Sequence, residues 1–366
     1  MLKARQRVGV LLNGEGIRSG VHAGTTRASY GAGILLLNHA HTEPKNNPAF
    51  HRRVACGRLC QRGHETFAPL PFRAVGCIFK GPLAGNPLVV FPEARGLSDE
   101  EMQAITREIH QQETTFVIPR EPRVEDKEGI RVRIFLPTKE VPFAGHPTLG
   151  TAMALQALWK ERKLPLRKTV RLALNVGQVP VTFRQEADGL LYDEMEQPDP
   201  QFSSAHDPSA VAPLLGFQSG DIDTSLPIQL VSTGLPYVLV PLKSRDAVSK
   251  ISIDWTRALP WLERVDPDAM FYSYTLAGRE ENGTIQGRGI FPNGEDPATG
   301  SASGCLVSLL VKQGRLGAGE QILIEQGDQI HRPSRIYGSA AIRDGKVHSV
   351  HIGGYAIQVA SGEYVL

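Results

Sequence analysis

Three ionisable side chains lie next to predicted turns rather than on amphipathic faces. They are Glu113, His146 and Asp296. Carboxyl and imidazole groups act as general acids and bases when their surroundings bring their pKa values near the working pH. Each also has a simpler explanation: a solvated carboxylate at a strand start, a capping or core histidine, and a turn residue before proline. Together, beside two helix starts led by glycine, they predict a site that moves protons on a small anionic molecule.

The segment from Asp296 to Gly304 combines a lone carboxylate with small residues, and an apolar run ending before Gly314 follows it. This pattern predicts a tight turn that leads into a helix with glycine at its end. The first turn of a helix has free backbone N–H groups and a dipole that favours negative charge. The alternative is a capped core helix that binds nothing. The residues assigned to ligand binding, with Thr299 or Ser301 near the N-cap, are Thr299, Gly300 and Ser301.

A second helix start of the same kind is predicted at Gly145-His146-Pro147, with Pro147 at the first helical position. Glu113 falls where an earlier helix meets the predicted strand Thr114–Ile118. That earlier helix opens with Ser98 followed three residues later by Glu101, the pattern of a capping box.

The two halves of the chain repeat each other in outline. Gly85-Asn86-Pro87 resembles Gly234-Leu235-Pro236 at an offset of 149 residues (from 85 to 234). Gly145 resembles Gly300 at an offset of 155 residues (from 145 to 300). Coincidence among Gly/Pro turns is the alternative to an internal duplication. A duplicated α+β unit predicts two similar lobes whose glycine-led helices point at one shared cleft, where ligands usually bind.

Strands outnumber helices in the predicted order. Pro198 to Gly220 is expected to be a loop with a short helical element. The strands expected from alternation and turn residues are Phe72–Phe79, Leu88–Phe91, Thr114–Ile118, Arg131–Leu136, Leu172–Leu174, Val179–Phe183, Leu190–Glu196, Ile228–Leu230, Tyr237–Val240, Met270–Leu276, Ile285–Ile290, Ile322–Glu325, Ser339–Arg343, Lys346–Ile352 and Tyr355–Val359.

Composition excludes several classes of protein. The 366 residues suggest two domains, and no apolar run approaches the ~18 residues that a membrane-spanning helix needs. Residues 1–70 carry ten Lys and Arg against three Asp and Glu, a net charge of +7, whereas the remainder carries 30 against 35, a net charge of −5. The mildly acidic body argues against nucleic-acid binding. Four cysteines in a chain of this length do not indicate a disulfide framework, so a cytoplasmic setting is expected.

Residues 1–70 lack sustained periodicity and stay open to three interpretations. They could be an organelle-targeting leader, a disordered extension, or upstream sequence outside the working protein. We favour a poorly ordered segment without chemistry. Zinc ligation is a weaker possibility, because Cys-x3-Cys with scattered histidines matches zinc-site spacing poorly. The residues concerned are His51, Cys56, Cys60 and His64.

Four motifs occur in order along the chain. They are Gly85-Asn86-Pro87, Glu113-Thr114-Thr115-Phe116-Val117, Gly145-His146-Pro147-Thr148 and Asp296-Pro297-Ala298-Thr299-Gly300-Ser301-Ala302. On these motifs the chain from about Phe72 onward resembles the PhzF-like family, named for the phenazine-biosynthesis isomerase. The resemblance implies an α+β fold of the diaminopimelate-epimerase type, with two pseudo-symmetric lobes that each have a curved mixed sheet around a central helix.

The resemblance also implies roles for individual residues. Glu113 would shuttle a proton between carbons of a small carboxylate, while His146, Asp296 and Ser301 line the same site with Asn86. Gly145 and Gly300 would let backbone amides hold the substrate carboxylate. An apolar, closing cleft would raise the pKa of the glutamate toward neutrality.

Epimerases of this fold use two cysteines at the helix starts, but this chain has Ala144 and Pro297 or Ala298 near those points. Cys305 lies one turn into its helix and is expected to pack inside. Two-thiol racemisation is therefore disfavoured.

These observations predict a cofactor-independent, metal-free isomerase of a small unsaturated or cyclic carboxylate, and family membership suggests a homodimer. The alternatives are an epimerase, racemase or lyase using the same cleft, or a ligand-binding protein without catalysis. The expected domains are an extension at 1–70, lobe 1 at 71–185, to which a C-terminal strand of about 353–366 could return, and lobe 2 at 186–352.

Overall fold

The computed structural model describes residues 69–78, 81, 83–186, 190–277 and 284–366. The chain divides into the units Met1–His64 and Glu65–Leu366. Because the first unit lies outside the described residues, everything below concerns the second. Residues 1–68 of the predicted extension, with its possible zinc ligands, lie outside the described residues. The predicted boundary after residue 70 was wrong by one residue, because Leu70 already pairs with Tyr364 in a strand.

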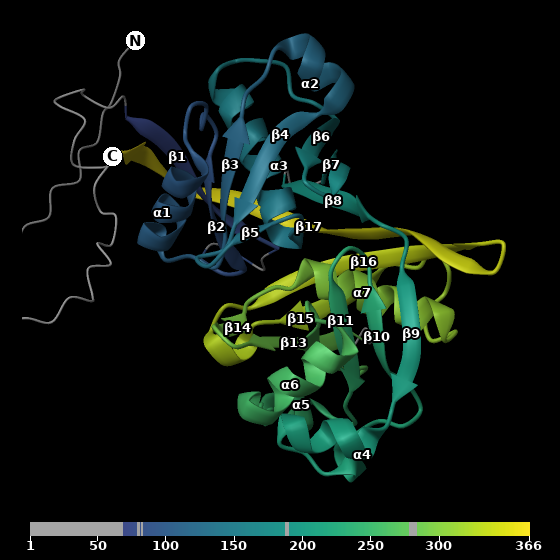
Figure 1. Ribbon diagram of the computed structural model, residues 1–366. Helices are drawn as coiled ribbons and strands as arrows, with labels where there is room; N and C mark the ends of the chain where they lie inside the picture. The colour runs from purple at the N-terminus through teal and green to yellow at the C-terminus, as the bar shows by residue number, and fades with distance from the viewer. Residues whose placement is uncertain (1–68, 79–80, 82, 187–189, 278–283) are drawn as a thin grey trace, which may run out of the picture. The chain divides into compact units, whose positions relative to one another are not determined.

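The first half of the described chain contains eight strands and three helices (Figure 1). The strands are β1 (Leu70–Cys77), β2 (Asn86–Phe91), β3 (Thr114–Ile118), β4 (Ile130–Phe135), β5 (Glu140–Val141), β6 (Thr169–Leu174), β7 (Gly177–Gln185) and β8 (Leu191–Gln197). The helices are α1 (Asp99–Ile109), α2 (Pro122–Glu128) and α3 (Gly145–Glu161).

The second half begins after β8. Its strands are β9 (Gln201–His206), β10 (Ile228–Ser232), β11 (Pro236–Pro241), β12 (Met270–Thr275), β13 (Ile285–Phe291), β14 (Gly294–Asp296), β15 (Ile322–Gln326), β16 (Ser334–Arg343) and β17 (Lys346–Tyr364). Its α-helices are α4 (Pro208–Val211), α5 (Arg245–Ser249), α6 (Trp255–Val265) and α7 (Gly300–Lys312), and its short 3-10 helices are Ala212–Leu215, Ser219–Asp221 and Asp328–Ile330.

The strand pairings of the first half recur in the second. In the first half, β2 and β3 pair in parallel, β3 and β4 antiparallel, β4 and β6 in parallel, and β6, β7 and β8 antiparallel in turn. In the second half, β11 and β12 pair in parallel, β12 and β13 antiparallel, β13 and β15 in parallel, and β15, β16 and β17 antiparallel in turn. The shared order supports the predicted duplication and confirms the α+β class.

One buried helix occupies the equivalent place in each half, and this confirms the predicted central helices. α3 lies between β5 and β6, and α7 lies between β14 and β15. α7 is buried from Gly300 to Val311 on all sides. A helix that is apolar all round is stable only when neighbours cover every face, and here β10, β11, β16 and β17 supply the cover.

β17 is continuous across the two halves (Figure 1). It pairs with β16 and β8 along its first part and with β1 along its last part. The predicted strands Lys346–Ile352 and Tyr355–Val359 are both present, but the predicted break between them is wrong because Gly353 and Gly354 continue the same strand. A side chain at Gly353 would lie 2.5 Å from the backbone oxygen of Asp193, so glycine is needed for close strand packing.

The division into lobes between residues 185 and 186 stays a proposal. The strand that follows this point, β8, is hydrogen-bonded to β7 before it and to β17 near the C-terminus.

Local signals in the sequence had mixed success. The capping box of Ser98 and Glu101 is present at the start of α1 and is confirmed. Pro147 is the third residue of α3 rather than the first, because the helix begins at Gly145. The predicted loop after Pro198 contains β9, an exposed strand at the sheet edge that pairs with β10. Its polar residues lack the alternation that would have indicated a strand.

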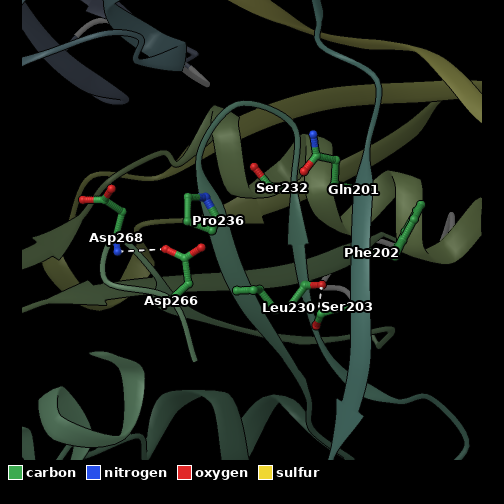
Figure 2. A pocket seen from close by; sticks show the side chains of 8 residues that line it. All are labelled: Gln201, Phe202, Ser203, Leu230, Ser232, Pro236, Asp266 and Asp268. Atoms are coloured by element: carbon green, nitrogen blue, oxygen red, sulfur yellow. Dashed lines mark hydrogen bonds between the residues drawn. The ribbon is translucent and has the colours of Figure 1, made fainter. Parts of the chain in front are cut away.

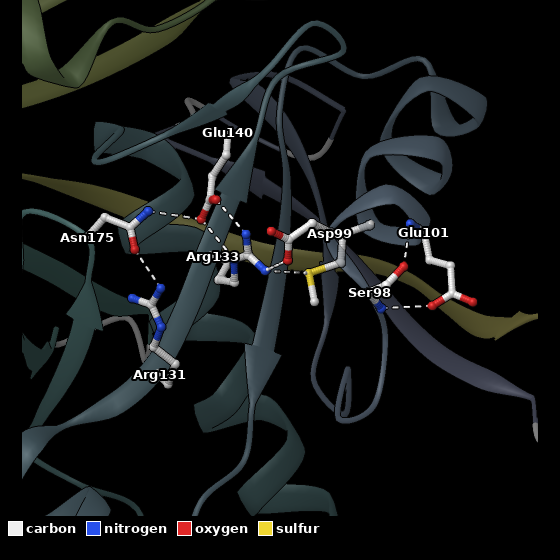
Figure 3. A network of polar contacts seen from close by, with 8 residues as sticks. Ser98, Asp99, Glu101, Arg131, Arg133, Glu140 and Asn175 are labelled. Carbon is white, nitrogen blue, oxygen red and sulfur yellow. Dashed lines mark hydrogen bonds and ion pairs between the residues drawn. The ribbon is translucent and has the colours of Figure 1, made fainter.

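A polar network fastens α1 to the sheet of the first half (Figure 3). Arg133 of β4 donates to Glu140 through Nε at 2.9 Å and through Nη2 at 2.5 Å. Its Nη1 donates to Asp99 in the first turn of α1. Asn175 donates to Glu140 at 2.9 Å and accepts from Arg131 at 2.5 Å. Arg133 of β4 thus joins β5, through Glu140, to the start of α1, through Asp99.

Candidate functional site

Asn86 is the centre of the candidate site. Its Nδ2 atom lies 2.6 Å from Asp296 Oδ1, 3.0 Å from His146 Nδ1 and 3.1 Å from the backbone oxygen of Ala298. Asn86 begins β2 and His146 is the second residue of α3, whereas Asp296 ends β14 in the other half. One fully buried amide therefore joins the two halves of the chain at this point.

Glu113 faces His146. Its Oε2 atom lies 3.5 Å from His146 Nε2, and its side chain is 16% exposed against 4% for the histidine. Glu113 directly precedes β3, so the strand fixes its position. The glutamate is not in bulk water, and it lies beside a helix start as the sequence predicted.

Three polar atoms of this site are buried and have no hydrogen-bond partner in the described part of the chain. They are Asn86 Oδ1, Glu113 Oε2 and His146 Nε2. Buried polar groups are nearly always paired, so a cluster of unpaired ones calls for an explanation such as a bound ligand.

The starts of α3 and α7 touch each other. A side chain at Gly145 would lie 2.9 Å from the backbone nitrogen of Ser301. No side-chain cap binds the first amides of either helix among the described residues. The N-cap of α7 is Thr299, as one of the two sequence interpretations held, but its hydroxyl donates to Asp296 Oδ2 at 2.7 Å instead of accepting from the helix. The free N–H groups at these two helix starts can donate hydrogen bonds to an anion.

The predicted residues Thr299, Gly300 and Ser301 are held by partners that the sequence did not identify. Tyr237 OH lies 2.8 Å from Ser301 Oγ. Gln326 Nε2 donates to Thr299 Oγ1 and to the backbone oxygen of Asp296, both at 2.8 Å.

The carbonyl of Gly300 is held from the first half, because it accepts from Gln197 Nε2 at 3.0 Å. Gln197 ends β8 and Gln326 ends β15, the strand that follows α7. Only the tertiary pairing brings them to the site, so no local pattern could have indicated them.

Burial shifts the pKa values of the titratable groups at the site. Desolvation raises the pKa of Asp296 to about 7, although hydrogen bonds from Thr299 and Asn86 oppose the rise. Desolvation, and then the charge of Asp296, hold the pKa of Glu113 well above its usual value. Desolvation lowers the pKa of His146 to about 3, so the imidazole is neutral at physiological pH.

The site has little positive charge from side chains. None of the hydrogen bonds of Asn86, His146, Asp296 or Ser301 in the described part of the chain comes from a lysine or an arginine. Because the imidazole of His146 is neutral, the helix dipoles of α3 and α7 are the positive ends at the site. No cluster of three or more potential metal ligands is present among the described residues.

Two cavities lie away from these residues. One of about 300 Å³ is bordered by β9, β10 and the segment before β12, with Asp266 and Asp268 at one side and Leu230 between them and β9 (Figure 2). The other, of about 630 Å³, is bordered by the β16–β17 turn and Lys312 at the end of α7. Neither includes Glu113 or His146 in its lining, so the predicted cleft between lobes stays a proposal.

Cys305 is fully buried, as predicted from its place one turn into the helix. Its sulfur lies 3.4 Å from Thr233 Oγ1, and desolvation raises its pKa to about 12. A thiol with such a pKa is not a thiolate near neutral pH and is a poor base or nucleophile. The described helix starts therefore offer no thiol pair for racemisation.

None of the helices in the described ranges is long and apolar enough to cross a membrane.

Solved structures define the class of fold. The chain is similar to a probable proline racemase from Agrobacterium radiobacter K84, with a TM-score of 0.56 and 12% identity over 82% of this chain and 93% of that one. This likeness shows the fold alone, which is of the diaminopimelate-epimerase type. The chain is also similar to a PhzF-family phenazine biosynthesis protein from Bacillus anthracis, with a TM-score of 0.72 and 27% identity over 82% of this chain and 100% of that one.

Sequence comparisons narrow the class to a family. Residues 79–362 match the family described as phenazine biosynthesis-like protein, PhzC-PhzF. The trans-2,3-dihydro-3-hydroxyanthranilate isomerase of Pseudomonas aeruginosa is 33% identical over 287 residues, which cover 78% of this chain and 95% of that protein. The chain belongs to the PhzF family and is an isomerase of that family.

Proposed function

We propose that this isomerase acts without a cofactor on a small unsaturated or cyclic carboxylate, and that Glu113 moves the proton. The observation that carries the proposal is the meeting of Glu113, His146 and Asp296 beside the uncapped starts of α3 and α7, with buried polar atoms left unpaired. Such a site brings together a group that can act as an acid or a base and the N-termini of two helices, which can bind an anion.

The proposed step needs only one group that gives and takes a proton. The Glu113 carboxylate accepts a proton from one carbon of the substrate and becomes a carboxylic acid. The C–H electron pair moves into the conjugated system, and a second carbon then takes the proton back from Glu113. No oxidant or reductant is consumed, and the product is an isomer of the substrate. Desolvation raises the pKa of Glu113, and this suits the exchange, because a carboxyl group with a raised pKa binds the proton more readily than an ordinary carboxylate does.

The substrate carboxylate would lie at the helix starts. Gly145 and Gly300 carry no side chain that could block the backbone amides, and Ser301 adds a hydroxyl held by Tyr237. In this proposal the hydroxyl of Thr299 and the amide of Asn86 donate hydrogen bonds to Asp296 and fix the position of its carboxyl group. The helix dipoles stabilise the negative charge that develops when the carbon loses its proton.

The relative from Pseudomonas aeruginosa suggests the substrate class. Its name specifies trans-2,3-dihydro-3-hydroxyanthranilate, a cyclic, unsaturated carboxylate. Because this relative and the present chain are 33% identical over 287 residues, we propose a compound of the same chemical class as the substrate here. We also propose that the chain forms a homodimer, which light scattering of the purified protein tests directly.

The test uses that compound in deuterated water. The unaltered chain should convert it and incorporate solvent deuterium at the carbon that is protonated last. Glu113→Gln keeps the shape of the side chain but cannot transfer the proton, so both conversion and exchange should fall by at least about 100-fold, the range of general acid–base catalysis. Glu263→Gln, an exposed glutamate on α6, is the matched control and should change neither.

The outcomes separate the proposal from its rivals. Full conversion by Glu113→Gln would rule out the proposed mechanism. Deuterium at a stereocentre with inversion and no shift of the double bond would indicate an epimerase, and release of a fragment would indicate a lyase. Binding of the compound without any chemistry, together with no effect of Glu113→Gln, would indicate a ligand-binding protein.

A further inference from the structure

The orientation of the Asn86 amide is fixed by a backbone carbonyl. The amide atom that faces the oxygen of Ala298 at 3.1 Å must be the donor nitrogen, because a carbonyl oxygen only accepts. The same Nδ2 atom faces Asp296 Oδ1 and His146 Nδ1. The orientation of this side chain is therefore set by an atom whose hydrogen-bonding role cannot change.

This orientation constrains the histidine. An amide nitrogen has hydrogens but no lone pair to offer, so its 3.0 Å contact with His146 Nδ1 is favourable only when Nδ1 is unprotonated. In a neutral imidazole the proton then belongs on Nε2. The imidazole also has a hydrogen bond with the backbone of Pro87, but a proton on Nδ1 would set two N–H groups against each other at the Asn86 contact.

The acceptor that faces Nε2 is a carboxyl oxygen of Glu113. Nε2 lies 3.5 Å from Glu113 Oε2, and both atoms are buried without another hydrogen-bond partner in the described part of the chain. A hydrogen on Nε2 pairs these two atoms with each other. While Glu113 is ionised, as it must be to take a proton, a lone pair on Nε2 would face a second acceptor, which is unfavourable in a buried site.

We propose that Asn86 is a positioning residue that holds His146 in its Nε2–H tautomer, so that His146 binds Glu113 Oε2 and leaves Oε1 as the oxygen that transfers the proton. This inference rests on the proposed function for the role of Glu113. The burial of Oε2 agrees with it, because the exposed part of the glutamate side chain then lies elsewhere. His146 thereby orients the glutamate and acts as a hydrogen-bond donor rather than as a second base.

The experiment measures the tautomer directly, without substrate. The full chain is labelled with ¹⁵N in its histidine rings, and the His146 signals are identified by their loss in His146→Gln. We expect the Nε2 signal of His146 at the position of a protonated ring nitrogen and the Nδ1 signal at that of an unprotonated one at pH 7. A proton on Nδ1 in the unaltered chain would overturn the inference.

Two variants sharpen the result. Asn86→Ala removes the N–H groups that disfavour a proton on Nδ1, so a larger share of His146 should carry its proton on Nδ1. Thr299→Val is the matched control, because it removes a different hydrogen bond to Asp296 and should leave the His146 tautomer unchanged. An unchanged tautomer in a folded Asn86→Ala chain would also overturn the inference, and if that variant does not fold, the unaltered chain alone decides.

The experiments distinguish a failure of the proposed function from a failure of the tautomer assignment. If Glu113→Gln converts the compound normally while His146 carries its proton on Nε2, the mechanism is wrong and the tautomer assignment stands. If Glu113→Gln is inactive while the proton sits on Nδ1, only the role given to Asn86 is wrong.

Discussion

Gly145 and Ser301 meet where the two central helices begin. A side-chain carbon at Gly145 would lie 2.9 Å from the backbone nitrogen of Ser301, closer than carbon and nitrogen approach without displacement. The residues come from α3 and α7, the equivalent helices of the two halves. Their contact sets the distance between the two sets of free helix amides.

Gly145→Ala should therefore displace the helix starts while leaving the fold intact. Alanine favours a helix, so the substitution carries no intrinsic helical penalty, but its methyl group must push the start of α7 away. We expect kcat/KM for the proposed substrate to fall by about 10- to 100-fold, as for misplacements near 1 Å. Gly220→Ala, at a glycine with nothing within 4 Å, is the control for a new methyl group and should retain activity. Unchanged kinetics of Gly145→Ala would contradict a role for this contact.

Arg133→Gln should destabilise the first half. The substitution removes the charged hydrogen bonds to Glu140 and Asp99, and it leaves the partly buried Glu140 without its cation. Hydrogen bonds to charged groups suggest a loss of about 1–2 kcal/mol in the free energy of unfolding. Urea unfolding followed by circular dichroism measures it. Asp99→Asn removes only the exposed partner and should cost clearly less; an equal loss would show that Glu140 contributes nothing.

The Arg133 network also has a pH dependence. Hydrogen bonds from Arg133 lower the pKa of Glu140 below its usual value. A depressed pKa in the folded state gives stability that is present above the unfolded pKa and is lost as the pH falls through the folded pKa. The difference in unfolding free energy between Arg133→Gln and the unaltered chain should therefore shrink below about pH 4, where Glu140 becomes protonated in both states. A difference that stays constant down to pH 2 would contradict the pairing.

Asp193 should make the protein less stable as the pH rises. It is fully buried in β8, its carboxyl oxygens have no partner among the described residues beyond its own backbone, and desolvation raises its pKa to about 8. The unfolded value is about 3.9, so between about pH 4 and pH 8 the folded state binds the extra proton. Stability is thus fully present below the unfolded pKa and is lost as the pH rises toward the folded pKa.

The variant Asp193→Asn isolates that contribution. It cannot ionise, so its unfolding free energy should change less with pH over this interval, whatever its absolute stability. Asp126→Asn, at an exposed position in α2, is the control and should keep the slope of the unaltered chain. Parallel slopes for Asp193→Asn and the unaltered chain would show that Asp193 is ionised in the folded state.

Cys305 and Cys77 should resist thiol reagents while the protein is folded. Both are fully buried, and burial raises the pKa of Cys305 to about 12 and that of Cys77 well above its usual value. Because the thiolate is the reactive form, alkylation at pH 8 should be slow until denaturant is added. Mass spectrometry of the peptides that contain each cysteine measures this, with urea-unfolded protein as the labelled control. Rapid native labelling of Cys305 would reopen a thiol mechanism.

Local patterns in the sequence predicted elements that depend on local chemistry. The capping box at Ser98, the strand Thr114–Ile118 and the stop of α7 near Gly314 follow from hydrogen bonding and backbone freedom within a few residues. The repeated glycine motifs predicted two similar halves, because each half needs a glycine where its central helix begins next to the central helix of the other half.

Features that depend on distant partners could not be predicted from the sequence. Gln197 and Gln326 reach the site only through strand pairing, and an amide side chain at a strand end has no distinctive pattern. The predicted strands stopped on either side of Gly353 and Gly354, whereas the structure needs glycine there for the close approach of β8 and of Ile78. The hydrogen bonds of Asn86 likewise join segments 210 residues apart in the chain.

β17 has a mechanical consequence. β17 forms hydrogen bonds with β1 and β8 of the first half and with β16 of the second half. If the sheet of either half unfolds, the backbone hydrogen bonds that β17 makes with the other half are therefore also exposed. Loss of order near the C-terminus should spread to both halves, and the described unit should melt in one cooperative step.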